Sequence, residues 1–230
     1  MHITYISLFP DIYTSFLETS LIKKAIDKKI VICNLVNPRD FCDDKHKQID
    51  DDIYGGGAGM LMKAKPLIDA IENVIKKNKL LVSKNNRRII FMSPSKTIFD
   101  QKIANTYSMY EHLIFVSGRY EWIDYRREQY MKKKYKKHFI KLSLGTFITL
   151  WGETPSMVVT EAIVRLIPGV IKEAESYQRE SYSVDEWMNN LEYPQYTRPE
   201  ELLGMKVPKV LLSGNHANIE IWRQKNMKKL

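Results

Sequence analysis

The sequence predicts an α/β fold, in which a mainly parallel sheet is covered by helices. Along residues 1–170, short apolar segments of strand length alternate with longer segments whose apolar side chains recur every three or four residues. A polar stretch then begins near Lys172 and separates a short C-terminal segment from the rest. A chain of 230 residues is long enough for one large domain and a small one.

Two strands and a helix are predicted at the start of the chain. Residues 2–8 alternate between apolar and polar side chains and are bounded by Pro10, which is typical of a strand. Asp11 is expected to cap a helix that extends to Ile26, because the apolar side chains here have helical spacing. Residues 30–36 predict the second strand. A long glycine-rich loop follows.

The alternation continues through the middle of the chain. A helix is predicted through Leu67 and Ile75, where apolar side chains again recur at helical spacing. Two further strands are predicted at residues 88–92 and 112–117, with a helix at 98–107 between them. This order of elements favours a parallel sheet.

The last helix of the large domain is expected to be capped by Thr154, with Pro155 at its first position, and to stop before Pro168-Gly169. Beyond the polar stretch, a helix capped near Asn215 carries Trp222. We therefore predict three parts: a large domain over residues 1–170, a linker over 171–186 and a small domain over 187–230.

The composition excludes several classes of protein. A hydrophobic content of 44% and a charged content of 27% are globular values, so the chain is neither disordered nor fibrous. No apolar run is long enough for a membrane span, and no signal peptide is recognisable. Two cysteines cannot form a disulfide framework, which fits a reducing, cytoplasmic location.

Positive charge is concentrated in one stretch. The chain carries a net charge of +9, and between residues 126 and 141 eight cations stand against the single acid Glu128. Clustered cations favour a polyanionic partner, because they displace counterions from phosphates. A lysine-rich composition would produce the same excess without any partner, and the sequence leaves both explanations open.

Glycines gather at Gly55, Gly56, Gly57 and Gly59, where the backbone can adopt positive φ and approach a ligand closely. The run is not a P-loop, because Met60-Leu61 follows it, and it lacks the glycine spacing of a dinucleotide fingerprint. The five histidines are scattered, so no structural zinc is expected. Three short stretches at predicted strand ends, residues 92–94, 118–121 and 143–145, lie where open α/β sheets bind ligands.

Read together, these segments resemble the bacterial tRNA (guanine-N1)-methyltransferase family of the SPOUT superfamily. The matching motifs cover nearly the whole chain in the family's order. They are SLFP at 7–10, NPRD at 37–40, DDIYGGGAGMLM at 51–62, GRYEWID at 118–124, RLIPGV at 165–170 and the block LEYPQYTRPEELLGMKVPKVLLSGNH at 191–216.

The resemblance implies a fold and an activity. The large domain is expected to be a trefoil-knotted α/β methyltransferase domain, followed by a small, mostly helical, tRNA-binding C-terminal domain. The family transfers a methyl group from S-adenosylmethionine to N1 of the guanosine 3′ of the tRNA anticodon, position 37. Its members are homodimers whose active sites lie at the subunit interface, and the family also implies a magnesium requirement.

The resemblance also assigns residues. Arg165 is the expected catalytic arginine and Glu180 the expected general base. The expected cofactor-binding residues are Met92, Ser93, Pro94, Gly118, Tyr120, Glu121, Ile123, Ser143, Leu144, Gly145, Thr146, Phe147, Ile148, Thr149, Gly152 and Pro155. The expected tRNA-binding residues are Arg39, His46, Asp51, Gly55, Gly57, Gly59, Arg198, Ser213 and His216.

The reaction requires these residue types. Guanine N1 carries a proton and is a poor nucleophile until a carboxylate accepts that proton as general base. Negative charge then builds on O6, which a fixed guanidinium can stabilise.

Four positions depart from the family's pattern: Glu180 replaces an aspartate, Trp122 and Trp151 replace glycines, and Thr146 replaces an aspartate. A tRNA-binding protein that has lost cofactor binding is therefore the alternative to an active enzyme.

Overall fold

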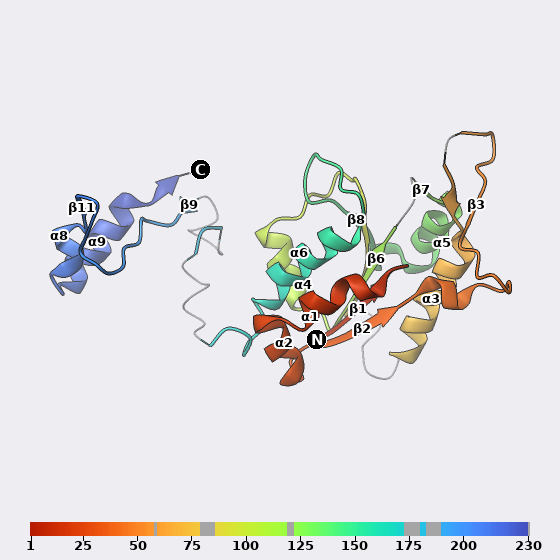
Figure 1. Cartoon of the computed structure of the whole chain (residues 1–230), viewed down its shortest axis with the longest axis horizontal. Helices are drawn as coiled ribbons and strands as arrows, with labels where there is room; N and C mark the ends of the chain where they lie inside the picture. The colour runs from red at the N-terminus through yellow and green to blue at the C-terminus, as the bar shows by residue number, and fades with distance from the viewer. Residues whose placement is uncertain (58, 79–85, 119–121, 173–179, 183–189, 230) are drawn as a thin grey trace. The chain divides into compact units, whose positions relative to one another are not determined.

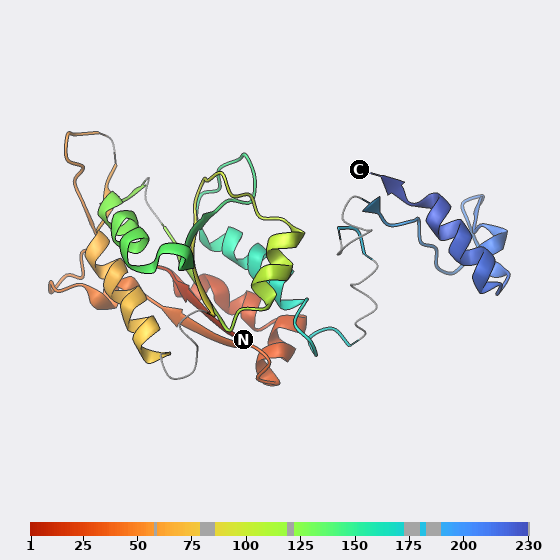
Figure 2. The ribbon, with the colours of Figure 1, turned by 180° about the vertical axis from the view of Figure 1, so that it is seen from behind.

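The computed structural model describes residues 1–57, 59–78, 86–118, 122–172, 180–182 and 190–229. The chain forms two compact units, Met1–Lys172 and Glu173–Leu230 (Figures 1 and 2).

The first unit is built on a five-stranded sheet in which every pair of neighbouring strands is parallel. The order of strands is β2-β1-β6-β5-β8, so β6 lies at the centre and all six of its residues are buried. The prediction of an α/β fold on a parallel sheet is therefore confirmed. The strands are β1 (His2–Ile6), β2 (Ile32–Val36), β5 (Arg87–Met92), β6 (His112–Ser117) and β8 (Phe139–Leu142).

Helices cover both faces of this sheet (Figures 1 and 2). Alternate strand residues point to opposite faces, so Phe115 packs in one hydrophobic cluster and Val116 in the other. The first cluster includes residues of η1 (Pro10–Tyr13), α1 (Thr14–Leu17), α2 (Ser20–Asp27), α4 (Gln101–Ser108) and α6 (Glu153–Val164). The second includes residues of η2 (Pro38–Phe41), α3 (Ala64–Lys77) and α5 (Tyr125–Tyr135), which η3 (Lys136–His138) follows. None of the helices in the described ranges is long and apolar enough to cross a bilayer.

The prediction of one helix capped by Asp11 was wrong. The segment forms three short helices, η1, α1 and α2, and Asp11 lies inside η1 rather than at its cap. Thr19 is extended and Ser20 has a φ of 52°, which ends the helical path between α1 and α2. The Thr19 hydroxyl donates to the Ser15 carbonyl at 2.5 Å, so a side chain replaces the next helical hydrogen bond.

The predicted start of α6 was also displaced. Gly152 occupies the cap position, Glu153 is the first helical residue, and Thr154 lies inside the first turn. Pro155 is therefore the third residue of the helix, where its missing N–H costs no intrahelical bond.

The sequence did not reveal α5 or a small second sheet. Helix α5 is strongly charged and buries only Arg127, Glu128 and Met131, so its apolar periodicity is weak. Asp124 caps it by accepting a hydrogen bond from the Arg126 amide. The small sheet contains β3 (Asp50–Asp51), β4 (Leu61–Met62) and β7 (Trp122–Ile123), each only two residues long.

The second unit contains short elements around one aromatic cluster. Asn215 caps its longest helix, as predicted, by accepting a hydrogen bond from the Asn218 amide at 3.2 Å. Rings of Tyr193 and Tyr196 lie 6.4 and 6.3 Å from the Trp222 ring. None of the described residues of this unit is fully buried. Its elements are β9 (Asn190–Leu191), β10 (Glu201–Leu202), β11 (Met205–Lys206), α8 (Lys209–Leu212), α9 (His216–Asn226) and β12 (Lys228–Lys229).

Burial of His112 generates a prediction about stability and pH. Burial, with smaller contributions from the charges of His2 and Arg87, lowers the pKa of His112 from 6.5 to about 3. Its Nε2 lies 3.0 Å from the Thr4 hydroxyl. Between these two pKa values the unfolded chain binds a proton that the folded chain does not bind, so stability falls as the pH falls below 6.5.

We expect His112→Gln, which keeps a hydrogen-bonding group beside Thr4, to reduce the loss of unfolding free energy between pH 7 and pH 5 by about 2 kcal/mol. Urea denaturation at both pH values measures this. Substitution of the exposed His46 by Gln is the control, because it removes one imidazole from the surface and leaves the buried site intact. A variant of His112 with the wild-type pH dependence would contradict the prediction.

Candidate active site

Three predicted cofactor loops begin at the same edge of the large sheet. They follow β5, β6 and β8, which are neighbours in the order β6-β5-β8 and are parallel. In the strand register Met92 lies opposite both Ser117 and Leu142, so the loops that begin at Ser93, Gly118 and Ser143 start side by side. We call residues 93–99, 118–121 and 143–152 the cofactor loops; of the second, only Gly118 is described.

Backbone hydrogen bonds join the first and third cofactor loops. The Ser93 amide donates to the Leu142 carbonyl at 3.0 Å. Further along, the Ser143 amide donates to Thr97 at 3.0 Å, and the Phe99 amide donates to the Ser143 carbonyl at 2.8 Å. The pairing of β5 with β8 thus continues into the loops, which fixes one loop against the other.

Gly152 holds the start of α6 against the end of β6. A Cβ atom at this position would lie 3.0 Å from Ser117 Cα and 3.4 Å from the Gly118 amide nitrogen. Contacts this short to backbone atoms are tighter than side chains usually make, so glycine lets the two segments approach closely without displacing either one. The third cofactor loop therefore returns from the edge strand β8 to the end of the central strand β6.

A buried polar network lies beneath this contact. The Tyr13 hydroxyl is 3.1 Å from the Ser117 hydroxyl and 2.9 Å from the Ser156 hydroxyl. The Glu153 carboxylate, fully buried, accepts a 2.6 Å hydrogen bond from the Ser7 hydroxyl. Hydrogen bonds between buried polar groups rigidify the structure. The network therefore connects the ends of β1 and β6 to the first turn of α6.

Sequence reasoning did not identify this network. Ser7 lies in the SLFP motif, but Tyr13, Ser117, Glu153 and Ser156 carry no sequence signal that separates them from surface polar residues. Their partners are between 104 and 146 positions away in the chain, so only the folded structure reveals these bonds.

Most of the predicted cofactor-binding residues fall into two groups. The first lies at the common sheet edge or in the turn around Gly152 and contains Met92, Ser93, Pro94, Gly118, Ser143, Leu144, Gly145, Gly152 and Pro155. The second, Thr146, Phe147, Ile148 and Thr149, lies on an exposed part of the third loop. Ile123 belongs to β7, and its side chain touches the open side of Gly118. Tyr120 and Glu121 lie outside the described residues.

The exposed part of the third loop is apolar. Ile148 is 79% exposed, Leu150 87% and Trp151 40%. The Thr149 hydroxyl donates to the Trp151 carbonyl at 2.9 Å and closes the turn. The indole that replaces a family glycine is therefore partly accessible to solvent and does not lie buried within the loop.

The small sheet connects the glycine-rich loop to the second cofactor loop. Strand β3 pairs antiparallel with β4, and β4 pairs in parallel with β7, which places Met62 beside Ile123. The segment between β3 and β4 extends away from the large sheet as a long hairpin (Figure 1). Gly55, Gly56, Gly57 and Gly59 all have positive φ, so the glycine run is used for its backbone conformation.

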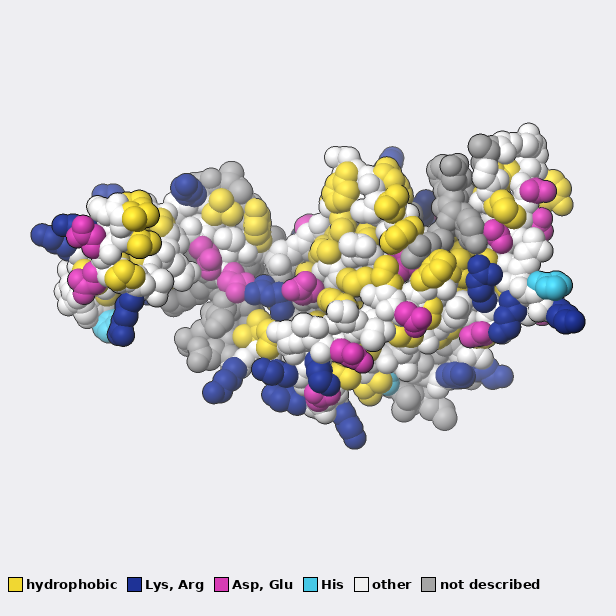
Figure 3. Space-filling model, in the orientation of Figure 1, with side chains coloured by type: hydrophobic (Ala, Val, Ile, Leu, Met, Phe, Trp, Pro, Cys, Tyr) yellow, Lys and Arg dark blue, Asp and Glu magenta, His cyan; other side chains and the backbone are white. Residues whose placement is uncertain are grey.

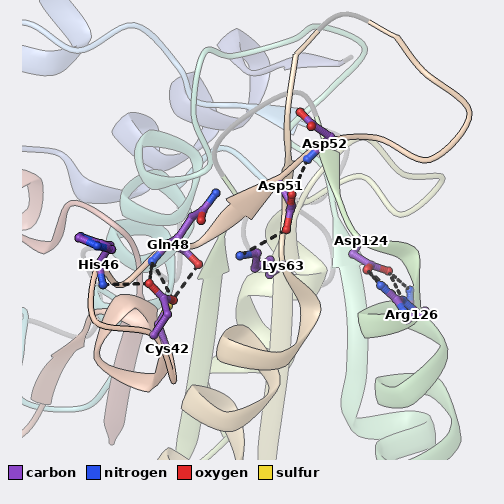
Figure 4. Close-up of polar contacts among 9 residues, drawn as sticks. Cys42, His46, Gln48, Asp51, Asp52, Lys63, Asp124 and Arg126 are labelled. Atoms are coloured by element: carbon purple, nitrogen blue, oxygen red, sulfur yellow. Dashed lines mark hydrogen bonds and ion pairs between the residues drawn. The ribbon is translucent and has the colours of Figure 1, made fainter.

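Two acidic side chains near this hairpin, those of Asp51 and Asp124, form ion pairs (Figure 4). Asp51 lies 3.4 Å from the Lys63 ammonium, and Asp124 pairs with Arg126 at 2.5 Å. Hydrogen bonds from Arg126 lower the pKa of Asp124. Within the described ranges, no group of three or more His, Cys, Asp or Glu side chains is arranged to hold a metal ion. The magnesium that the family implies therefore has no matching ligand set there.

The structure places the other predicted tRNA-binding residues in both units. The Arg39 guanidinium donates to the Lys47 carbonyl at 3.1 Å and supports the loop that carries the exposed His46. In the second unit, Arg198, Ser213 and His216 are exposed. The Ser213 hydroxyl donates to the Val210 carbonyl at 2.7 Å, so it contributes to the turn between α8 and α9.

Arg165 lies far from the cofactor loops of its own chain. It is the C-cap of α6, whereas Gly152 is the N-cap that contacts Ser117. Thirteen residues at about 1.5 Å per residue separate the two positions by roughly 20 Å. Arg165 instead lines a groove of about 680 Å³ together with side chains of α1 and α2. Glu180 belongs to the second unit, where it is half-buried.

The close approach at Gly152 generates a prediction. We expect Gly152→Ala to lower the free energy of unfolding by about 1 to 3 kcal/mol, because the added methyl group meets backbone atoms that cannot move independently. Gly145→Ala is the matched control: its methyl group would meet the exposed Phe147 ring, which can rotate away. Chemical denaturation measures both, and an equal cost at the two sites would contradict the argument.

Known proteins resemble this chain over its whole length. Residues 1–230 match the family described as tRNA (Guanine-1)-methyltransferase TrmD. A tRNA (guanine-N(1)-)-methyltransferase of Carboxydothermus hydrogenoformans is 44% identical over 225 residues, which are 98% of this chain and 82% of the relative. Enzymes of the same name from Clostridium botulinum and Staphylococcus carnosus are 43% and 42% identical, and in each the match covers 97% of this chain and 85% and 84% of the relative.

The family model matches the full chain, and the relatives match nearly all of it. The structure also places the loops that the family resemblance predicts at one edge of the sheet. The chain therefore belongs to the tRNA (guanine-N1)-methyltransferase family.

Proposed function

We propose that this protein transfers a methyl group from S-adenosylmethionine to N1 of the guanosine 3′ of the tRNA anticodon. The observation that carries the proposal is the meeting of three cofactor loops at one edge of the sheet, in a member of a family whose relatives are named for this reaction. No competing nucleotide-binding motif occupies this edge.

The chemistry of the cofactor loops fits S-adenosylmethionine. Met92, Leu144 and Pro94 offer apolar contacts to a purine ring, and the Gly118 and Gly145 backbones can approach a ligand closely. The bonds between the first and third loops hold these groups before the ligand arrives, which lowers the entropy cost of binding. When bound, the cofactor supplies an electrophilic methyl group on a sulfonium.

Two residues of this chain are proposed to act on the guanine. The Glu180 carboxylate accepts the N1 proton, which leaves an electron pair on N1 for the methyl group. The Arg165 guanidinium stabilises the negative charge that this loss of a proton places on O6. The longer side chain of Glu180, compared with the family's aspartate, still supplies a carboxylate.

Arg165 and the cofactor loops are proposed to meet across a homodimer. Within one chain they lie at opposite ends of α6, roughly 20 Å apart. Apolar side chains also gather on the face that carries α6 and the third cofactor loop, including exposed Ile148, Leu150 and Val158 (Figure 3). A second copy that covered this face would bury these side chains and bring its Arg165 to the loops.

A trefoil knot is part of the proposal. After the edge strand β8, the chain bonds to the loop that follows β5 and then packs on the end of β6. This path across the ends of three strands supports the proposal of a knot, in which the chain passes through an earlier loop. For the second unit, we propose that residues 187–230 form a tRNA-binding domain, joined by a linker over 171–186 that lies mostly outside the described residues.

The direct test is incubation of the protein with S-adenosylmethionine and an unmodified tRNA that carries guanosine after the anticodon. N1-methylguanosine should appear by mass spectrometry, and a transcript with adenosine at that position should remain unmodified. If tRNA binds but neither methylation nor cofactor binding is detected, the protein is a non-catalytic tRNA-binding protein.

Arg165→Ala should abolish turnover while leaving the affinity for S-adenosylmethionine unchanged, because the arginine acts on guanine O6. Subunit mixing tests where it acts. A purified heterodimer of one Arg165→Ala chain and one Gly118→Val chain, which lacks a working cofactor loop, should recover about half the wild-type rate from its single intact site. An inactive heterodimer would show that Arg165 serves its own chain's loops.

Glu180→Gln should lower kcat at least roughly 100-fold, the usual contribution of a general base, while Glu180→Asp retains activity. Single-turnover kinetics measure the methyl-transfer step itself. A near-wild-type rate for Glu180→Gln would reassign the base, with Asp185 as the next candidate; Asp185 lies outside the described residues.

A further inference from the structure

The structure separates the eight cations of residues 126–141 into different roles. Four of them form ion pairs: Arg126 with Asp124, Lys134 with Glu72 at 2.7 Å, and both Lys132 and Lys141 with Glu128. A fifth, Arg127, is buried, and its guanidinium lies over the Phe91 ring, 4.1 Å from the ring centre. These five contribute to the packing of α5, so composition alone does not account for them.

Three lysines of the stretch remain. Within the described part of the chain, Lys133, Lys136 and Lys137 form no ion pair with an acidic side chain, and all three are exposed. Lys136 differs from the other two because it lines a pocket. The pocket has a volume of about 310 Å³, and we call it the lysine pocket; it is lined by Ser95, Thr97, Lys132, Lys136, Phe139, Ile140 and Lys141.

Glu128 fixes two of the pocket's lysines. Its carboxylate lies 2.7 Å from the Lys132 ammonium and 3.4 Å from that of Lys141, and the residue is almost fully buried. Burial alone would raise the pKa of Glu128, but the hydrogen bonds and charges of these lysines lower it. One carboxylate thus holds two ammonium groups beside the third, from Lys136, and the pocket keeps a net positive charge.

Two residues with hydroxyl groups, Ser95 and Thr97, also line the pocket. The Ser95 hydroxyl is 3.0 Å from the Thr97 carbonyl and 3.0 Å from the Lys141 carbonyl, so it ties the first cofactor loop to β8. Thr97 lies on the same loop and is half-buried. The Ser95 hydroxyl already donates within the protein, so the lysine ammonium groups are the charged donors that this pocket offers to phosphate oxygens.

We propose that the lysine pocket binds a phosphate of the tRNA backbone, with Lys136 as its principal contact. This inference rests on tRNA being the substrate, as proposed above. The pocket lies against a cofactor loop, so a tRNA whose target base reaches the cofactor loops passes near it. The pocket is open to solvent and not an enclosed cavity, which suits one phosphate of a continuous strand.

Stabilisation of α5 by its dipole does not explain all the lysines of the lysine pocket. Lysines in the last turn of a helix interact favourably with its dipole, and Lys132, Lys133 and Lys134 occupy that turn. Lys136 follows the helix with a φ of 40°, and Lys141 comes from β8. The pocket therefore collects cations from separate elements.

The test measures the affinity of the full-length protein for an unmodified tRNA transcript by fluorescence anisotropy over a series of KCl concentrations. For Lys136→Gln we expect the slope of log K against log salt to become shallower by about 0.7 to 0.9, the value of one phosphate contact, and affinity at 0.1 M salt to fall roughly fivefold to eightfold. Lys136→Arg should retain most of the slope. The KM for tRNA should rise with kcat unchanged.

Lys133→Gln is the matched control, because it removes the same charge from the same stretch but outside the pocket. An equal effect of Lys133→Gln and Lys136→Gln, or none for Lys136→Gln, would overturn the assignment. Thermal stabilisation by inorganic phosphate that Lys136→Gln abolishes, with an unchanged tRNA slope, would identify a free-anion site instead and also overturn it. Wild-type protein that binds no tRNA would refute the proposed function itself, which distinguishes the two failures.

Discussion

The contact between Gly152 and the end of β6 organises the edge of the sheet at which the three predicted cofactor loops begin. A Cβ atom at Gly152 would lie 3.0 Å from Ser117 Cα, so glycine allows the first turn of α6 to lie directly on the central strand. The third cofactor loop must then cross from β8 over the end of β5 to reach this point, which brings it alongside the first loop. The buried hydroxyl groups of Tyr13 and Ser156 satisfy the polar atoms beneath the contact.

The same contact fixes where Arg165 can act. Helix α6 is a rigid rod of 12 residues, so anchoring its first turn at the cofactor loops places its last turn at the other end of the domain. This is why we propose that Arg165 acts at the loops of a second chain. The proposed dimer thus follows from the position of a helix end, and the exposed apolar side chains of the third loop are consistent with it.

Charge in residues 126–141 serves packing and, as we propose, binding. Helix α5 has few apolar side chains with which to pack, and part of its attachment comes from the pair between Lys134 and Glu72 and from Arg127 over Phe91. Ion pairs of this kind contribute little singly, so their number matters. Of the three lysines without an acidic partner in the described ranges, Lys136 lines the lysine pocket, beside the cofactor loop that contains Ser95.

The sequence alone predicted the parallel sheet, the strand at residues 112–117 and the loops that follow the strands, because burial on both faces produces unmistakable apolar runs. The glycine run and the motifs 7–10, 118–124 and 165–170 were sufficient to indicate the family. Only the tertiary structure decided the rest. Two-residue strands such as β4 and β7 depend on distant partners, and a charged helix such as α5 lacks apolar periodicity. Arg165 is separated from the cofactor loops because the start of α6 packs against the distant strand β6. The lysine pocket is formed by residues from the loop after β5, the end of α5 and β8. Contacts between residues so far apart in the chain are not encoded by any local pattern.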